Sequence, residues 1–215
     1  MLENPFATRF TRPGEIVPVD ISGKRMVVED FLQDLDQCGG IGAIVGPHGS
    51  GKTNILSRLY VEALQSHYTV KRYSLRSTTW RDLKNIIRML LVSKPDDLVL
   101  LDSWERLSCM AGKVLCRVAM SRGCRLVVTS HKAISIPVLV TCQASLKSFL
   151  AIIKQLPDSG VWLGSLIMNK DIETAFDVYQ PNLREALFSL YDVFEDRSRR
   201  AMQSGRKGCI DRNGC

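Results

Sequence analysis

The sequence lacks a long hydrophobic run. No stretch approaches the roughly 20 consecutive apolar residues that a membrane-spanning helix requires. The opening residues, MLENPFATRF, contain no apolar run behind a basic patch, so they do not have the pattern of a signal peptide. We therefore expect no membrane partner and a cytoplasmic location.

The cysteines lack the pattern of a disulfide framework or of a metal site. There are seven of them, an odd number, with no CxxC pair and no histidine at a matching spacing. This argues against structural disulfides and against a structural zinc site. Free thiols suit a reducing compartment, which agrees with the cytoplasm.

Acidic residues are fewer than basic ones. Asp and Glu number 22 against 29 Lys and Arg, which gives a formal net charge of +7. Such a balance is typical of a solvated basic tail, or of a chain whose partner is nucleic acid or an acidic protein. Much of the excess lies near the C-terminus, at Arg197, Arg199, Arg200, Arg206, Lys207 and Arg212.

Strand-like and helix-like segments alternate from residue 41 onward. Helical spacing of apolar residues predicts helices over 52–66, 79–91 and 104–121. This alternation predicts an α/β fold with a mostly parallel five-stranded sheet between helices. Short apolar or alternating runs predict the strands at 41–45, 69–75, 98–101, 125–130 and 137–142.

The segments on either side of this core are of a different kind. Residues 1–37 are expected to form an irregular arm and a short helix over 24–35, ahead of a core over 38–158. Helical spacing over 146–155, 171–179 and 183–199 predicts a small helical lid over 159–200, with a linker at 157–164. Residues 201–215 are expected to be a basic, flexible tail.

Residues 46–53, GPHGSGKT, match the pattern G-x-x-x-x-G-K-[ST]. Glycines let the backbone curl tightly, so that several N–H groups converge on one phosphate group. The helix that follows adds the positive end of its dipole, and Lys52 adds a mobile positive charge. The sequence therefore predicts a nucleotide site for ATP with Mg²⁺. The expected binding residues are Gly46, Pro47, His48, Gly49, Ser50, Gly51, Lys52, Thr53 and Asn54.

A carboxylate closes the apolar run at 98–101. Asp102 is expected to hold Mg²⁺ together with the Thr53 hydroxyl, because the carboxyl ends of parallel strands face the ligand crevice. A second interpretation is that Asp102 caps a helix that starts near Trp104.

Hydrolysis needs a group that polarises the attacking water. Many ATPases carry a glutamate directly after the strand aspartate, but this chain has Ser103 there. Glu105 is the nearest substitute, and its alternative role is that of an acid in the first turn of a helix.

The run 125–131 turns polar at its carboxyl end. Thr129 and Ser130 are expected to contact the γ-phosphate or the attacking water, because that end of the strand faces the crevice. His131 is a third candidate, although a lone histidine at this point is more often a turn residue.

These residues resemble those of P-loop NTPases, most closely small bacterial AAA-type ATPases. The segment Asn4-Pro5-Phe6 is similar to an N-terminal box of such proteins that lies near the adenine. Residues 182–188, NLREALF, look like their lid helix, whose arginine reaches the γ-phosphate. The resemblance implies that Arg184 is a second sensor of the nucleotide, and we expect it to act with Lys52 and Glu105 in catalysis. The alternative is an exposed charge that pairs with Glu185 or Asp192.

Three function classes follow from these residues. The first is an ATPase that couples nucleotide state to a helical lid and a partner. The second is a small-molecule or nucleotide kinase, which shares the loop and the sheet. The third is a weakly hydrolysing, nucleotide-dependent module that contacts nucleic acid through the basic tail. No N/T-K-x-D segment is present to read guanine, which favours ATP.

Overall fold

A five-stranded parallel sheet forms the centre of the computed structural model, which describes residues 3–75, 79–132 and 134–210, with 204–210 described by their backbone alone. The strand order is β2-β3-β4-β1-β5, and every neighbouring pair is parallel. The fold class predicted from the sequence is confirmed. The strands are β1 (Ile41–Val45), β2 (Val70–Ser74), β3 (Leu98–Asp102), β4 (Arg125–Ser130) and β5 (Val138–Thr141).

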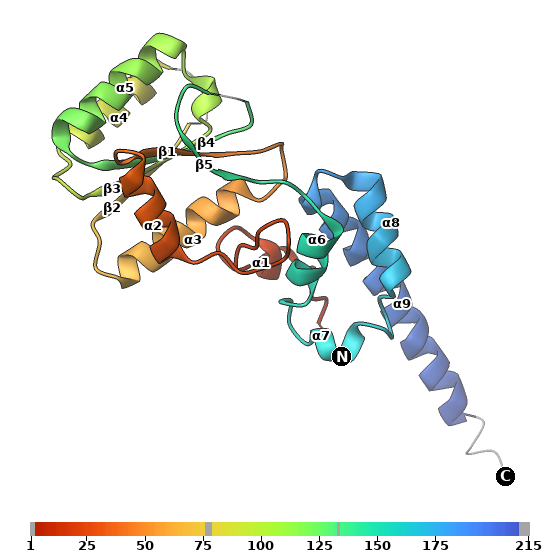
Figure 1. The fold of residues 1–215 in the computed structure, drawn as a ribbon. Coiled ribbons are helices and arrows are strands. Elements are labelled where there is room, and N and C mark those ends of the chain that lie inside the picture. The colour runs from red at the N-terminus through yellow and green to blue at the C-terminus, as the bar shows by residue number, and fades with distance from the viewer. Residues whose placement is uncertain (1–2, 76–78, 133, 211–215) are drawn as a thin grey trace.

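Helices cover both faces of this sheet (Figure 1). On one face α4 (Trp80–Leu91) and α5 (Cys109–Arg122) pack against alternate residues of β3, including Val99 and Leu101. On the other face α2 (Val28–Gln37) and α3 (Lys52–Gln65) pack against Leu98 and Leu100. Side chains of a strand alternate between faces, so an uninterrupted apolar run such as 98–101 supplies both cores.

The predicted helix over 104–121 is wrong in its first turns. A short 3-10 helix, η1 (Trp104–Arg106), precedes α5, which begins only at Cys109. The Ser108 side chain accepts a hydrogen bond from the Ala111 N–H and so caps α5. Ser103, just before η1, has a left-handed backbone with φ of 70°. This turn matters because it redirects the chain where β3 reaches the candidate site.

A helical unit lies beside the sheet domain (Figure 1). Its core joins the arm residue Phe6 to apolar side chains of four helices, among them Phe149, Trp162 and Phe194. The helices are α6 (Leu146–Ile153), α7 (Ser159–Trp162), α8 (Asn169–Tyr179) and α9 (Leu183–Ile210). The arm also holds the short helix α1 (Thr8–Thr11).

The expected linker at 157–164 is instead part of this core. Trp162 is fully buried, and its indole N–H donates to the Pro157 carbonyl at 2.7 Å. Replacing so deeply buried an aromatic side chain with alanine typically costs about 3–5 kcal/mol. The helical unit therefore begins with α6 rather than at residue 159.

The two ends of the chain also differ from expectation. The helix predicted over 24–35 begins at Val28, after a turn in which Asp20 accepts hydrogen bonds from the Ser22 and Lys24 N–H groups. Helix α9 continues to Ile210, so residues 201–210 of the expected tail are helical, and 211–215 lie outside the described residues. Among the described helices, none is both long and apolar enough to cross a membrane.

Candidate nucleotide-binding site

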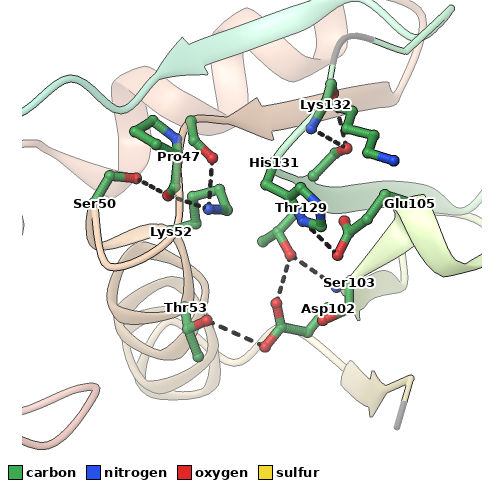
Figure 2. Close-up of polar contacts among 12 residues, drawn as sticks. Pro47, Ser50, Lys52, Thr53, Asp102, Ser103, Glu105, Thr129, His131 and Lys132 are labelled. Atoms are coloured by element: carbon green, nitrogen blue, oxygen red, sulfur yellow. Dashed lines mark hydrogen bonds and ion pairs between the residues drawn. The ribbon is translucent and has the colours of Figure 1, made fainter. Parts of the chain in front are cut away.

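The loop at 46–53 connects β1 to α3, as its motif requires. Gly49 and Gly51 have left-handed backbones, with φ of 73° and 98°, which residues with a Cβ rarely adopt. The Lys52 ammonium donates to the carbonyls of Gly46 and Pro47, at 2.6 Å each (Figure 2). The lysine thus curls back over its own loop, where an anion bound by the loop would lie.

Lys52 is half-buried, and that burial lowers the pKa of its ammonium. The neighbouring Cys142, Glu105 and Asp102 oppose the effect. Among the described residues, the Lys52 ammonium donates only to these two carbonyls and has no carboxylate in direct contact. The loop is therefore electrostatically suited to a polyphosphate.

Asp102 lies at the centre of a short chain of hydrogen bonds (Figure 2). Its two carboxylate oxygens accept from Thr53 Oγ1, at 3.3 Å, and from Thr129 Oγ1. The Ser103 N–H donates to Thr129 Oγ1 at 2.9 Å. The helix-cap role for Asp102 is not supported, because Ser108 caps α5 and η1 has no side-chain cap.

The donor set at this point fits Mg²⁺. One carboxylate and one hydroxyl are the protein ligands expected when phosphate oxygens and water complete the coordination. No group of three or more His, Cys, Asp or Glu side chains within the described part of the chain forms a metal cage. The arrangement therefore suits a metal that arrives with its nucleotide.

Glu105 is turned toward the cavity by the left-handed Ser103. Only 9% of its side chain is exposed, and Oε1 lies 2.8 Å from His131 Nδ1 (Figure 2). Because a carboxylate only accepts, Nδ1 carries the proton of this bond. The other oxygen, Oε2, is buried and has no hydrogen-bond partner among the described residues. Glu105 thus has one oxygen bonded to His131 and one that is free to accept a hydrogen bond.

The contact between His131 and Glu105 was not predicted from the sequence. The His131 ring also contacts the ring of His48 from the phosphate loop, with centroids 4.2 Å apart. The signal in the sequence was its place directly after the polar end of β4. The pairing with Glu105 depends on the left-handed turn at Ser103, which the sequence does not predict.

A cavity of about 500 Å³ brings most of the predicted residues together, although Gly46, Pro47 and Ser130 do not line it. Its size falls in the range of small-molecule sites. Arg184 at the start of α9 also lines it, exposed and without a hydrogen bond or ion pair to any described residue. The expected alternative for Arg184, a pair with Glu185 or Asp192, is absent among those residues. The polar lining includes His48, Lys52, Thr53, Asp102, Glu105 and Thr129.

Two predicted binding residues have other roles in the structure. The Ser130 side chain is fully buried, and its hydroxyl is bonded to the backbone of Lys132. The Asn54 side chain accepts from the Gly14 N–H at 2.8 Å and donates to the Ile16 carbonyl at 2.9 Å. Asn54 lines the cavity, but its amide fastens the N-terminal arm to α3.

The segment Asn4-Pro5-Phe6 does not line the cavity. Phe6 packs on Trp162 with centroids 5.2 Å apart, and the Asn4 amide donates to the Tyr191 carbonyl and to Glu195. The arm residues that do line the cavity come later, from Thr8 to Ile16. The segment therefore anchors the arm to the helical unit.

A second cavity, of about 390 Å³, adjoins the first. The two share Ser50, Gly51, Asn54, Ile152 and Leu183 in their linings. Its other walls are mostly apolar and come from residues 17–21 of the arm, Ile55 and the end of β5. A polar cavity and an apolar one thus meet along the phosphate loop.

Comparison with solved structures identifies the fold. The replication initiator DnaA bound to AMPPCP and single-stranded DNA is 17% identical, with a TM-score of 0.58 over 84% of this chain and 63% of that one. AMPPCP-bound DnaA from Aquifex aeolicus is 18% identical, with a TM-score of 0.53 over 81% and 65%. A variant of RuvB from Thermotoga maritima is 13% identical, with a TM-score of 0.54 over 80% and 66%.

These likenesses show an AAA-type P-loop NTPase fold. The chain spans less than two thirds of the length of each of these three proteins. No family model matches the sequence. No curated protein is similar to it in sequence.

Proposed function

We propose that this chain binds ATP with Mg²⁺ and hydrolyses it, and that the bound nucleotide sets the position of the helical unit. The observation that carries the proposal is the convergence of Lys52, Asp102, Glu105 and Arg184 on one cavity beside the phosphate loop. AMPPCP-bound DnaA has the same fold, which supports an adenine nucleotide as the ligand. The cytoplasm is the proposed location.

The two adjoining cavities suit the two ends of ATP. Loop N–H groups and Lys52 would hold the triphosphate in the polar cavity, with Thr53 and Asp102 as the ligands of Mg²⁺. The metal would supply positive charge to the phosphate oxygens. The base would lie in the apolar cavity between the arm and Ile55. Asn54 contributes by fixing the arm that forms this wall.

Glu105 is the group that would take the proton of the attacking water. Oε2 is free to accept a hydrogen bond from that water, while His131 holds Oε1 and fixes the carboxylate. As the water oxygen bonds to the γ-phosphorus, its proton passes to Glu105 and the bond to the ADP oxygen breaks. Thr129 holds Asp102 in place beside this point.

The start of α9 lies against the phosphate loop. A Cβ at Gly49 would collide with the Asn182 side chain, which shows how closely loop and helical unit approach. Two residues further along, the unpaired Arg184 faces the same cavity. A γ-phosphate would attract Arg184 and so favour a closed position of the helical unit.

A weakly hydrolysing binding module is the second candidate. The observation in its favour is that Ser103 occupies the usual place of the catalytic glutamate. Its partner would be nucleic acid or an acidic protein, as proposed for the basic tail. Within the described part of α9, however, Arg197, Arg199 and Arg200 pair with Asp171, Glu195 and Asp196. Binding of such a partner by the tail would therefore depend on Arg206, Lys207 and Arg212, whose side chains lie outside the described residues.

Glu105→Gln separates the two candidates. The amide keeps the size of the side chain but cannot take a proton, so we expect unchanged ATP affinity and phosphate release slowed by about 100-fold or more. Affinity would be measured with a fluorescent ATP analogue, and release with a phosphate sensor. If wild type and variant release phosphate equally slowly, the chain is a binding module rather than an ATPase.

A further inference from the structure

The outer surface of α4 and α5 carries cations that no acid neutralises. Arg81, Lys84 and Arg88 on α4, and Lys113 and Arg117 on α5, are all exposed. None of them makes an ion pair or side-chain hydrogen bond with a residue that the structure describes. The two helices lie side by side over one face of the sheet (Figure 1). We call the exposed side of these two helices, with its five cations, the α4–α5 face.

Acids do not offset this charge. Within residues 80–91 and 109–122 the single acidic residue is Asp82. Its two oxygens accept from the Tyr73 hydroxyl at 2.6 Å and the Thr79 hydroxyl at 2.7 Å. The Asp82 carboxylate is thus engaged in the N-terminal cap of α4. A surface with several unpaired cations and no available anion fits a polyanionic partner.

Apolar side chains lie among these cations. Trp80 is 78% exposed and Met110 70% exposed, although both residue types are usually well buried. Trp80, Lys84 and Arg88 follow one another at four-residue steps, so they lie along one stripe of α4. Met110 and Lys113 begin a similar stripe on α5. Each helix therefore begins with an exposed apolar side chain that is followed by cations.

We propose that the α4–α5 face binds single-stranded nucleic acid. Such a strand offers phosphates to the cations and unstacked bases to an exposed aromatic ring, a combination typical of single-strand binding proteins. A membrane surface fits less well, because the continuous apolar sides of both helices are buried against the sheet. The apolar side chains that remain exposed on the two helices, among them Trp80, Met110 and Val114, are interspersed in sequence with cations.

The α4–α5 face is separate from the nucleotide site. No residue of α4 or α5 lines either cavity at the phosphate loop. Changes on this face should therefore leave ATP binding intact, so that failure of this proposal and failure of the proposed ATPase function are distinguishable.

The test uses two variants of the full chain that lose equal charge. One replaces Lys84, Arg88 and Arg117 with alanine, and the matched control replaces the exposed Lys147, Lys154 and Lys170. Binding of a labelled, mixed-sequence single-stranded oligonucleotide would be followed by fluorescence anisotropy across a salt series. Circular dichroism and ATP affinity would verify the fold of each variant.

We expect the first variant to bind at least tenfold more weakly, and the control to change less than twofold. The slope of log affinity against log salt should fall by about 2 for the three lost phosphate contacts, at roughly 0.7 each. Trp80→Ala should weaken binding by about tenfold through lost stacking.

Four outcomes would overturn the proposal. The first is no measurable binding by the wild type, and the second is an equal loss in both triple variants. The third is a loss produced only when Arg206, Lys207 and Arg212 are replaced, which would move the contact to the tail. The fourth is binding to phosphatidylserine vesicles or to a polyglutamate peptide without binding to the oligonucleotide.

Discussion

The two oxygens of the Glu105 carboxylate have different partners. His131 holds Oε1, whereas the buried Oε2 lacks one among the described residues. Leaving a buried polar atom unpaired costs about 1–3 kcal/mol, so its persistence at this point favours a ligand that supplies the missing donor. A water at the γ-phosphate is such a ligand in our proposal. His131 is then a positioning residue, which acts through Glu105.

Replacing His131 tests this role. In His131→Ala the carboxylate loses its fixed orientation, so we expect kcat for phosphate release to fall about tenfold or more, with KM unchanged. His131→Asn should recover part of the rate, because its amide N–H can donate to Oε1. An unchanged kcat in the alanine variant, or a loss seen only in KM, would contradict the role. Phosphate release under steady-state conditions provides both constants.

Single residues were predictable where a spacing fixes the chemistry. Lys52 and Thr53 belong to a contiguous motif, and Asp102 ends an uninterrupted apolar run, so their places follow from short-range pattern. The hydrogen bond from Ser130 to the Lys132 carbonyl could not be predicted, because alternation places a residue at a strand end without fixing the partner of its hydroxyl. The hydrogen bonds of Asn54 could not be predicted, because its partners, Gly14 and Ile16, come from a distant irregular segment.

Among the elements, α8 and α9 are joined by a bidentate ion pair. Arg197 donates to both oxygens of Asp171, at 2.6 and 2.8 Å, and also to the Leu166 carbonyl. Asp171 in addition accepts from the Met168 N–H at the start of α8. The hydrogen bonds from Arg197 are the largest cause of the lowered pKa of Asp171. One carboxylate thus stabilises both a helix end and a helix pair.

The pH dependence of stability follows from this pair. Because the pKa of Asp171 is lower in the folded chain, its contribution is fully present above the unfolded value near 3.9 and is lost as pH falls through the folded value. We expect Asp171→Asn to lower the free energy of unfolding at pH 7 by about 1–2 kcal/mol, and to flatten the loss of stability below pH 4. Urea unfolding followed by circular dichroism measures this. The exposed Asp177→Asn on α8 is the control, and an equal effect there would refute the assignment.

Elements were predicted best where local signals agree. The start of α4 was placed within a residue by its apolar spacing, and in the structure Thr79 and Asp82 form a capping box at that point. The break between η1 and α5 was missed, because the apolar spacing continues through it while Ser108 restarts the helix. The segment 157–164 was expected to be a linker, but Trp162 buries its ring in a core assembled from distant helices.

At the scale of the whole molecule, the proposed nucleotide cavity lies where the sheet domain meets the helical unit. Its walls come from the phosphate loop, the ends of β3 and β4, the arm and the start of α9. The domain boundary expected at residue 158 misses this arrangement, since both α6 and the arm belong to the core of the helical unit. Local sequence patterns do not reveal such long-range packing.

We expect ATP to draw the helical unit toward the sheet domain by attracting Arg184. In wild type, AMPPCP should shorten the distance between dyes placed on α5 and α8, as measured by energy transfer. Arg184→Ala should abolish most of this change while weakening AMPPCP binding by about tenfold or less. Lys170→Ala, an exposed cation of α8, is the control and should behave as wild type. A full distance change in Arg184→Ala would show that the arginine does not couple the two units.

The central claim is that the loop at 46–53 grips a triphosphate through its amides and Lys52. Its most direct test is the ATP affinity of wild type and Lys52→Ala by isothermal titration calorimetry with Mg²⁺ present. We predict measurable binding by the wild type and loss of at least 100-fold in affinity in the variant. Both proteins should have the same circular dichroism spectrum and unfolding midpoint within error. Equal affinity in two folded proteins would contradict the assignment.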